Sequence, residues 1–350
     1  MAPAQRATAG QPPQAVFEMV RRTPLAIAAQ ALMLGLVIVL ASLPWWADLG
    51  TMSSAVEFLY YLAIAQLWNL LAGYGGLVSI GQQAWLGLGA YVLVAFALHT
   101  DYNPYWALPL GGLAALVLAW PASRLLFRLN GAYFAVGSWV IAEVFRLFFA
   151  NVTSLGGGTG TSITSSLMAI DEWWLDALSV WSALSIAVLS VLGVYLFLRS
   201  RHGLALTAVR DSETASGALG VPVQKVKLTV YLASAFGFGV VGVLVYLVKL
   251  RVSPDAAFSV EWSALAFLIV IIGGFGTIEG PIIGAIVYFV LRSLLADYGS
   301  WYLVSLGVLA IAVMLVERRG IWGAIQARTG IELFPIQRRI RRRDLTDPGK

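Results

Sequence analysis

The polar residues that could handle a solute lie beside two glycine-rich stretches of an otherwise apolar chain. Recurrent helix breaks in two halves of a chain are typical of transporters built from structural repeats. Backbone groups freed by such breaks must face protein or a water-filled path. Close helix packing through small residues explains the same glycines, and this alternative stays open. We expect a translocation path that includes Gly73, Gly75, Gly76, Ser79, Gln82, Gln83, Gly273, Gly274 and Gly276.

Glu143 and Arg146 form a second candidate site, because they lie three residues apart on one face of a predicted span. Ionisable groups at membrane depth are costly, so they face the bundle interior and find partners. The pair is either a self-neutralising structural contact near the outer interface or part of the solute path.

The sequence lacks the residues that chemical catalysis or metal binding would need. It has no cysteine and only two histidines, His99 and His202. No phosphate-binding loop, His-Glu-x-x-His motif or acidic cluster occurs, so we expect no enzyme, no metal and no cofactor in this chain.

The composition indicates a membrane protein. Hydrophobic residues make up 59% of the 350 residues and charged residues only 12%, about half the charge of a soluble domain. We therefore predict an all-α integral membrane protein of about 8–10 transmembrane helices, some broken at glycine. The apolar runs fall near 25–46, 54–72, 82–99, 105–127, 131–150, 179–198, 226–248, 260–277, 281–297 and 300–316.

The positions of lysine and arginine predict the orientation. With a cytoplasmic N-terminus, eighteen of them fall in internal segments, and only Lys249 and Arg251 fall in external loops. We expect both termini in the cytoplasm, with no nucleic-acid partner for the net charge of +5. The chain divides into a disordered cytoplasmic N-terminal segment (1–23), a transmembrane domain (24–316) and a basic cytoplasmic tail (317–350), whose arginines anchor the topology against lipid or dock a partner.

Two loops could meet other proteins. The internal segment 199–225 has helical character from Leu204 to Leu219 and ends at Gly220 and Pro222. It is either an interfacial helix or a docking surface for a soluble partner. The external loop 151–178 could receive a binding protein outside the membrane or serve as a connector.

Over roughly residues 55–335 the chain resembles the LivM-type permeases of branched-chain amino-acid ABC importers. No single matching stretch is specific, but seven occur in the right order. They are 67–81 (LWNLLAGYGGLVSIG), 131–136 (GAYFAV), 143–146 (EVFR), 203–221 (GLALTAVRDSE followed by ALGV), 253–255 (SPD), 273–276 (GGFG) and 319–323 (RGIWG).

This resemblance implies a heteromeric complex in the inner membrane of a bacterium. A second homologous permease, two ATP-binding subunits that carry ATP and Mg, and a periplasmic or lipid-anchored solute-binding protein would complete it. Segment 199–225 is then similar to the family's coupling loop, although Thr214 departs from the common Glu-Ala-Ala pattern. The implied coupling residues are Arg210, Asp211, Glu213, Ala215, Leu219 and Gly220.

Two alternatives remain at this point. A secondary transporter or channel that works alone would also contain broken helices, but ion coupling needs buried relays, for which the chain offers only Glu57, Glu143 and Glu261. Relatives of the same permease type import urea, amides or carboxylic acids, so the sequence alone leaves the solute open.

Overall fold

Each of the ten apolar runs is a helix in the computed structural model. The structure describes residues 16–20, 24–168, 170–295, 298–299, 301–317, 319–331, 333–335 and 339–343. Within these ranges, eight helical stretches are long and apolar enough to cross a membrane, and α3 is shorter. The all-α membrane class is therefore confirmed. The helices are α1 (Pro24–Ala41), α2 (Leu49–Asn69), α3 (Gln83–His99), α4 (Ala107–Leu126), α5 (Ala132–Ala150), α7 (Glu172–Arg199), α10 (Val223–Lys249), α12 (Glu261–Gly273), α13 (Glu279–Leu295) and α14 (Trp301–Val316).

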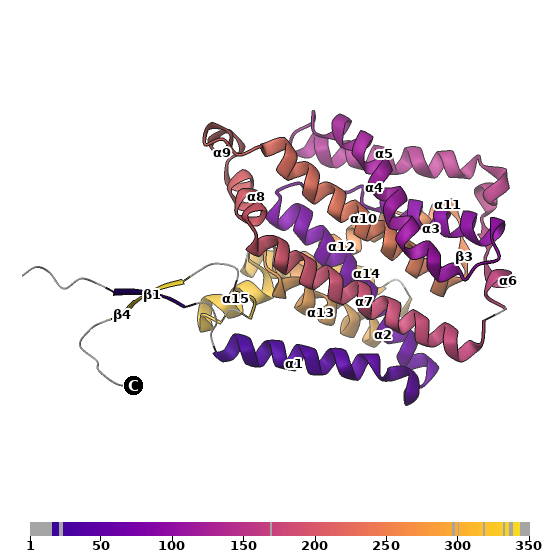
Figure 1. Ribbon diagram of the computed structural model, residues 1–350, viewed down its shortest axis with the longest axis horizontal. Helices are drawn as coiled ribbons and strands as arrows, with labels where there is room; N and C mark the ends of the chain where they lie inside the picture. The colour runs from indigo at the N-terminus through magenta and orange to yellow at the C-terminus, as the bar shows by residue number, and fades with distance from the viewer. Residues whose placement is uncertain are drawn as a thin grey trace, which may run out of the picture.

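Short elements connect these helices at the two ends of the bundle (Figure 1). One end carries α8 (Arg201–Asp211), α9 (Glu213–Ala218) and α15 (Gly320–Thr329), and the opposite end carries α6 (Thr164–Leu167) and α11 (Pro254–Ala257). The long helices lie along the axis that joins the ends, with α1 and α5 on opposite sides.

The first and last described segments pair with each other. β1 (Val16–Val20) runs antiparallel to β4 (Arg339–Arg343), beyond the end of the bundle that carries α8 and α15 (Figure 1). Both segments thus lie on one side of the bundle, whereas their placement in the cytoplasm stays a prediction. The expectation of a disordered N-terminal segment falls largely on residues outside the described ranges, but it is wrong for the residues of β1, which form a strand.

Close packing through glycine holds the centre of the bundle together. Helix α10 packs along α3 and α4, where Gly239 faces both Gly89 and Gly111. A Cβ atom at Gly239 would lie 2.5 Å from the Gly111 carbonyl oxygen, and one at Gly89 would overlap the Gly239 carbonyl oxygen. Small residues let helix backbones approach in this way inside membranes.

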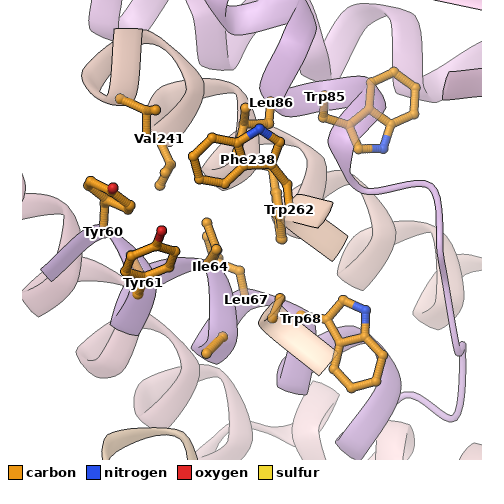
Figure 2. Packing of buried hydrophobic residues seen from close by; sticks show 14 of the residues in the cluster. Tyr60, Tyr61, Ile64, Leu67, Trp68, Trp85, Leu86, Phe238, Val241 and Trp262 are labelled. Atoms are coloured by element: carbon orange, nitrogen blue, oxygen red, sulfur yellow. The ribbon is translucent and has the colours of Figure 1, made fainter. Parts of the chain in front are cut away.

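Large apolar side chains fill the space beside this contact (Figure 2). The Tyr60 ring of α2 lies edge-on to Trp262 of α12, with ring centroids 6.2 Å apart, and Ile64 of α2 and Phe238 of α10 belong to the same cluster. These rings are almost completely buried, so the core that positions the glycine-rich stretches consists of α2, α3, α10 and α12.

The long loop after α5 is tied to the connection between α10 and α11. Its β2 strand (Thr161–Ser162) pairs antiparallel with β3 (Arg251–Val252), and the Ile163 N–H donates to the Leu250 carbonyl at 3.0 Å. Farther along, the Trp173 indole N–H donates to the Pro44 carbonyl at 3.1 Å. The loop is thus an anchored structure, and its role in receiving a binding protein stays a prediction.

The glycine contact generates a test. We expect Gly89→Ala to lower the free energy of unfolding by about 1–3 kcal/mol, because the added methyl group has no room against the Gly239 carbonyl. The matched control is Gly193→Ala in α7, where an added Cβ meets nothing within 4 Å and alanine favours the helix. Thermal unfolding of the purified chain in detergent compares the two, and equal melting temperatures would refute the packing role.

Candidate functional site

The first glycine-rich stretch ends α2 and forms the loop before α3. Helix α2 passes into a π-helical turn, η2 (Leu70–Tyr74), where the Gly75 N–H donates to the Leu70 carbonyl at 3.2 Å. Gly76 then takes a φ of +68°, which side chains other than hydrogen disfavour. Isolated π turns occur frequently at functional sites.

The second glycine-rich stretch lies against the first, and one asparagine joins them. The Asn69 side-chain amide donates from Nδ2 to the Thr277 carbonyl at 2.7 Å, and its Oδ1 accepts from the Gly276 N–H at 2.9 Å. Asn69 is fully buried, so these bonds supply partners to backbone groups that no helix can pair. The breaks, about two hundred residues apart in the chain, therefore form one structural unit.

The close approach at this unit requires glycine on both sides. A Cβ atom at Gly73 would overlap Oδ1 of Asn69 and lie 2.8 Å from the Gly276 nitrogen. Gly276 itself has a φ of +71°. The structure thus shows the packing role of these glycines, and their role in a transport path stays a prediction.

Arg210 reaches this unit from outside the bundle. It lies at the end of α8, and its Nη1 donates to the Gly73 carbonyl at 3.2 Å. We call Asn69, Gly73, Gly276, Thr277 and Arg210 the break junction. Arg210 was expected to meet a partner subunit; in the structure its guanidinium also contacts the inside of the bundle.

The other implied coupling residues are exposed. Segment 199–225 forms two helices rather than the single helix predicted from Leu204 to Leu219, because Ser212 ends α8 and caps α9 by accepting from the Ala215 N–H at 3.3 Å. Glu213 pairs with Lys227 of α10. Leu219 is 86% exposed, and Asp211, Ala215 and Gly220 are exposed as well.

The polar residues after the first break are buried within the chain. Gln83 accepts through Oε1 from the Ser263 hydroxyl of α12, and Gln82 accepts from Ser234 of α10 at 3.4 Å. The Ser79 carbonyl accepts from the Trp68 indole at 2.9 Å. Their side chains tie the start of α3 to its neighbours, and contact with a solute stays a prediction for them.

Glu143 and Arg146 pair as predicted, and a third charge joins them. Arg146 lies 2.6 Å from Glu143 and 2.5 Å from Asp255 of α11. The Glu143 and Asp255 side chains are 44% and 77% exposed on the side of the bundle. Only 22% of the α5 span is buried in this chain, so the cluster lies on a largely exposed face.

The structure thus places the expected residues in three groups. Gly73 and Gly276 lie at the break junction, with Gly75 and Gly76 beside it. Gly273 and Gly274 pack against the turn into α13 and the start of α15. Ser79, Gln82 and Gln83 form the buried group, and Glu143 and Arg146 form the third, on α5.

The sequence prediction missed three residues of these groups, namely Asn69, Thr277 and Asp255. An asparagine inside an apolar helix is itself a signal, because a buried amide needs partners. Thr277 contributes its carbonyl to Asn69 and donates its hydroxyl to the Gly274 carbonyl at 3.0 Å. The residue type alone predicts neither role.

Comparison with known proteins gives a consistent result. The family described as the permease component of the branched-chain amino acid transport system matches residues 50–316. The chain is 27% identical over 318 residues to the high-affinity branched-chain amino acid permease LivM of Escherichia coli, covering 83% of this chain and 74% of the relative. It is 25% identical over 284 residues to LivH of Salmonella typhimurium, covering 75% and 91%. No solved structure matches.

The break junction generates the second test. We expect Asn69→Ala to destabilise the chain, because an unpaired Gly276 N–H and an unpaired Thr277 carbonyl each cost about 1–3 kcal/mol. The control is Asn151→Ala, which removes one exposed bond from Nδ2 to the Leu147 carbonyl. Chemical denaturation in detergent measures both, and similar unfolding midpoints would contradict the bridging role of Asn69.

Proposed function

This chain belongs to the family of branched-chain amino acid transport permeases, and we propose that it carries branched-chain amino acids or related small solutes in a complex driven by separate ATP-binding subunits. As a permease subunit it is a transport protein rather than an enzyme. The proposed location is the inner membrane of a bacterium, with the α8–α9 end in the cytoplasm.

A second permease of similar sequence is the first proposed partner. The chain is similar to both LivM and LivH, two permeases whose names assign them to branched-chain amino acid transport. Two related chains with the same fold can face each other across a shared path. The charged face of α5 supports this pairing, because Glu143, Arg146 and Asp255 are too polar to lie against lipid tails.

One observation carries the coupling proposal, namely the bond from Arg210 to the Gly73 carbonyl. It links an exposed pair of helices to the point where both breaks meet. An ATP-binding subunit that docks on α9 and moves it would therefore act on the break junction through the adjoining end of α8, where Arg210 lies. Closure of the two ATP-binding subunits around ATP and Mg supplies the motion in this proposal.

The rival proposal of an ion-coupled transporter has less support. Such a protein needs a carboxylate that binds and releases an ion. Glu57 pairs with Arg292 and accepts from the Tyr60 hydroxyl at 2.9 Å, and Glu143 is held by Arg146. Both carboxylates are committed to structural bonds, which favours energy input from outside the chain.

Purification of the tagged chain in mild detergent from its native host tests the assembly. We expect a second permease and two ATP-binding subunits to co-purify. Reconstituted with its solute-binding protein, this complex should take up leucine only with ATP and Mg present. Recovery of the chain alone, with uptake driven by an ion gradient, would establish the secondary transporter instead.

The docking surface is tested at Leu219. We expect Leu219→Asp to reduce recovery of the ATP-binding subunits at least about tenfold, because a buried leucine contact contributes about 1.5–3 kcal/mol. The folded chain should be unaffected, since Leu219 is 86% exposed. Leu219→Met keeps the apolar contact and should keep the subunits bound. Full recovery of the complex with Leu219→Asp would place docking elsewhere.

A further inference from the structure

A cavity of about 690 Å³ opens at the α8–α15 end of the bundle, beside the break junction. Its walls come from the end of α2, from α7 and α8, from the second break and from α15. Pockets of roughly 300–1,000 Å³ are of the size that holds small molecules. None of the contacts described above fills this space.

The cavity is basic. Arg199, Arg201 and Arg210 line it, against a single lining carboxylate, Glu279. The Glu279 carboxylate already accepts from the N–H groups of Leu333 and Phe334, at 3.0 and 2.9 Å. The excess of positive charge favours an anionic occupant.

Two of the lining arginines are held in place, and the third is not. Arg199 donates to the Tyr195 hydroxyl at 2.9 Å, and Arg210 donates to the Gly73 carbonyl and pairs with Asp211 at 3.2 Å. Among the described residues, none forms a hydrogen bond or ion pair with the Arg201 guanidinium. Its guanidinium is therefore available for the two parallel bonds that carboxylate and phosphate groups accept.

A buried tyrosine in the wall provides an independent observation. Tyr74 is only 4% exposed, and its hydroxyl has no hydrogen-bond partner among the described residues. Buried hydroxyl groups in folded proteins almost always have a partner. Tyr74 lines the cavity, so a ligand that draws the ring toward the cavity can supply a partner to its buried hydroxyl.

We propose that this cavity binds a small anion, whose carboxylate or phosphate oxygens are held by the Arg201 guanidinium and the Tyr74 hydroxyl. The occupant would contact α8 and the second break together, since Arg210 and Gly276 are also in the wall. Binding would hold the coupling helix against the break junction. This effect on transport rests on the proposed function, whereas the binding itself does not.

Equilibrium dialysis of the purified chain in neutral detergent tests the site, with labelled inorganic phosphate and labelled succinate as separate probes. We expect saturable binding of at least one probe. Arg201→Gln and Tyr74→Phe should each weaken it at least about tenfold, since each removes a bond to the anion. Arg128→Gln, at an arginine outside the cavity wall, should bind like the unchanged chain.

Thermal unfolding separates a ligand role of Tyr74 from a structural one. Without ligand, Tyr74→Phe should melt no lower than the unchanged chain, because it removes only an unpartnered hydroxyl. Native mass spectrometry tests whether the anion is the headgroup of a lipid. An anionic phospholipid that stays bound to the unchanged chain and is lost in Arg201→Gln would identify a headgroup as the anion. The proposed site would be wrong if neither an anion nor a lipid binds saturably, or if all variants bind equally. This conclusion would hold whether or not the assembled complex takes up solute. In the assembled complex, the bound anion should lower ATPase activity.

Discussion

Backbone groups at a helix break inside a membrane need partners from the protein itself, and the arrangement at Asn69 follows from that constraint. Its amide donates to the Thr277 carbonyl and accepts from the Gly276 N–H. A single side chain at the first break thus provides hydrogen-bond partners to two backbone groups of the second break. The same contact explains why Gly73 has no side chain. It also brings the Gly73 carbonyl to a position that Arg210 reaches from α8.

The bundle contains two kinds of contact with different mechanical properties. Around Gly239, helices α3, α4 and α10 touch backbone to backbone, and any sliding would produce overlap. At the break junction, the close approach of Gly73 and Gly276 is accompanied by hydrogen bonds to carbonyl and N–H groups, and these bonds can exchange partners with little change in volume. We therefore interpret the glycine-packed helices as a rigid body and the junction as the place where rearrangement occurs.

The charged residues within the spans differ from those at the α8–α15 end in how they are paired. Within the spans, Arg146 and Arg292 are each paired with carboxylates. At the α8–α15 end, the cavity wall combines arginines with a carboxylate that already accepts two backbone N–H groups. Water can reach that end, so an unpaired arginine there costs little free energy. Its positive charge remains available to a ligand.

Composition and patterning determined the class of this protein, the ten helical segments and the helical character of segment 199–225. These features follow from local physics, because apolar length and glycine or proline stops act within one segment. The pairing of Glu143 with Arg146 was also predictable, since helix geometry alone places them on one face.

Only the tertiary structure decided which distant segments meet. The contact of Asn69 with Gly276 and Thr277, the third charge at Asp255 and the inward bond of Arg210 all join parts of the chain that lie far apart in sequence. Such contacts depend on how whole helices pack, and residue type alone does not predict them. The cavity beside Tyr74 arises in the same way, from walls contributed by separate helices that become neighbours only in the folded bundle.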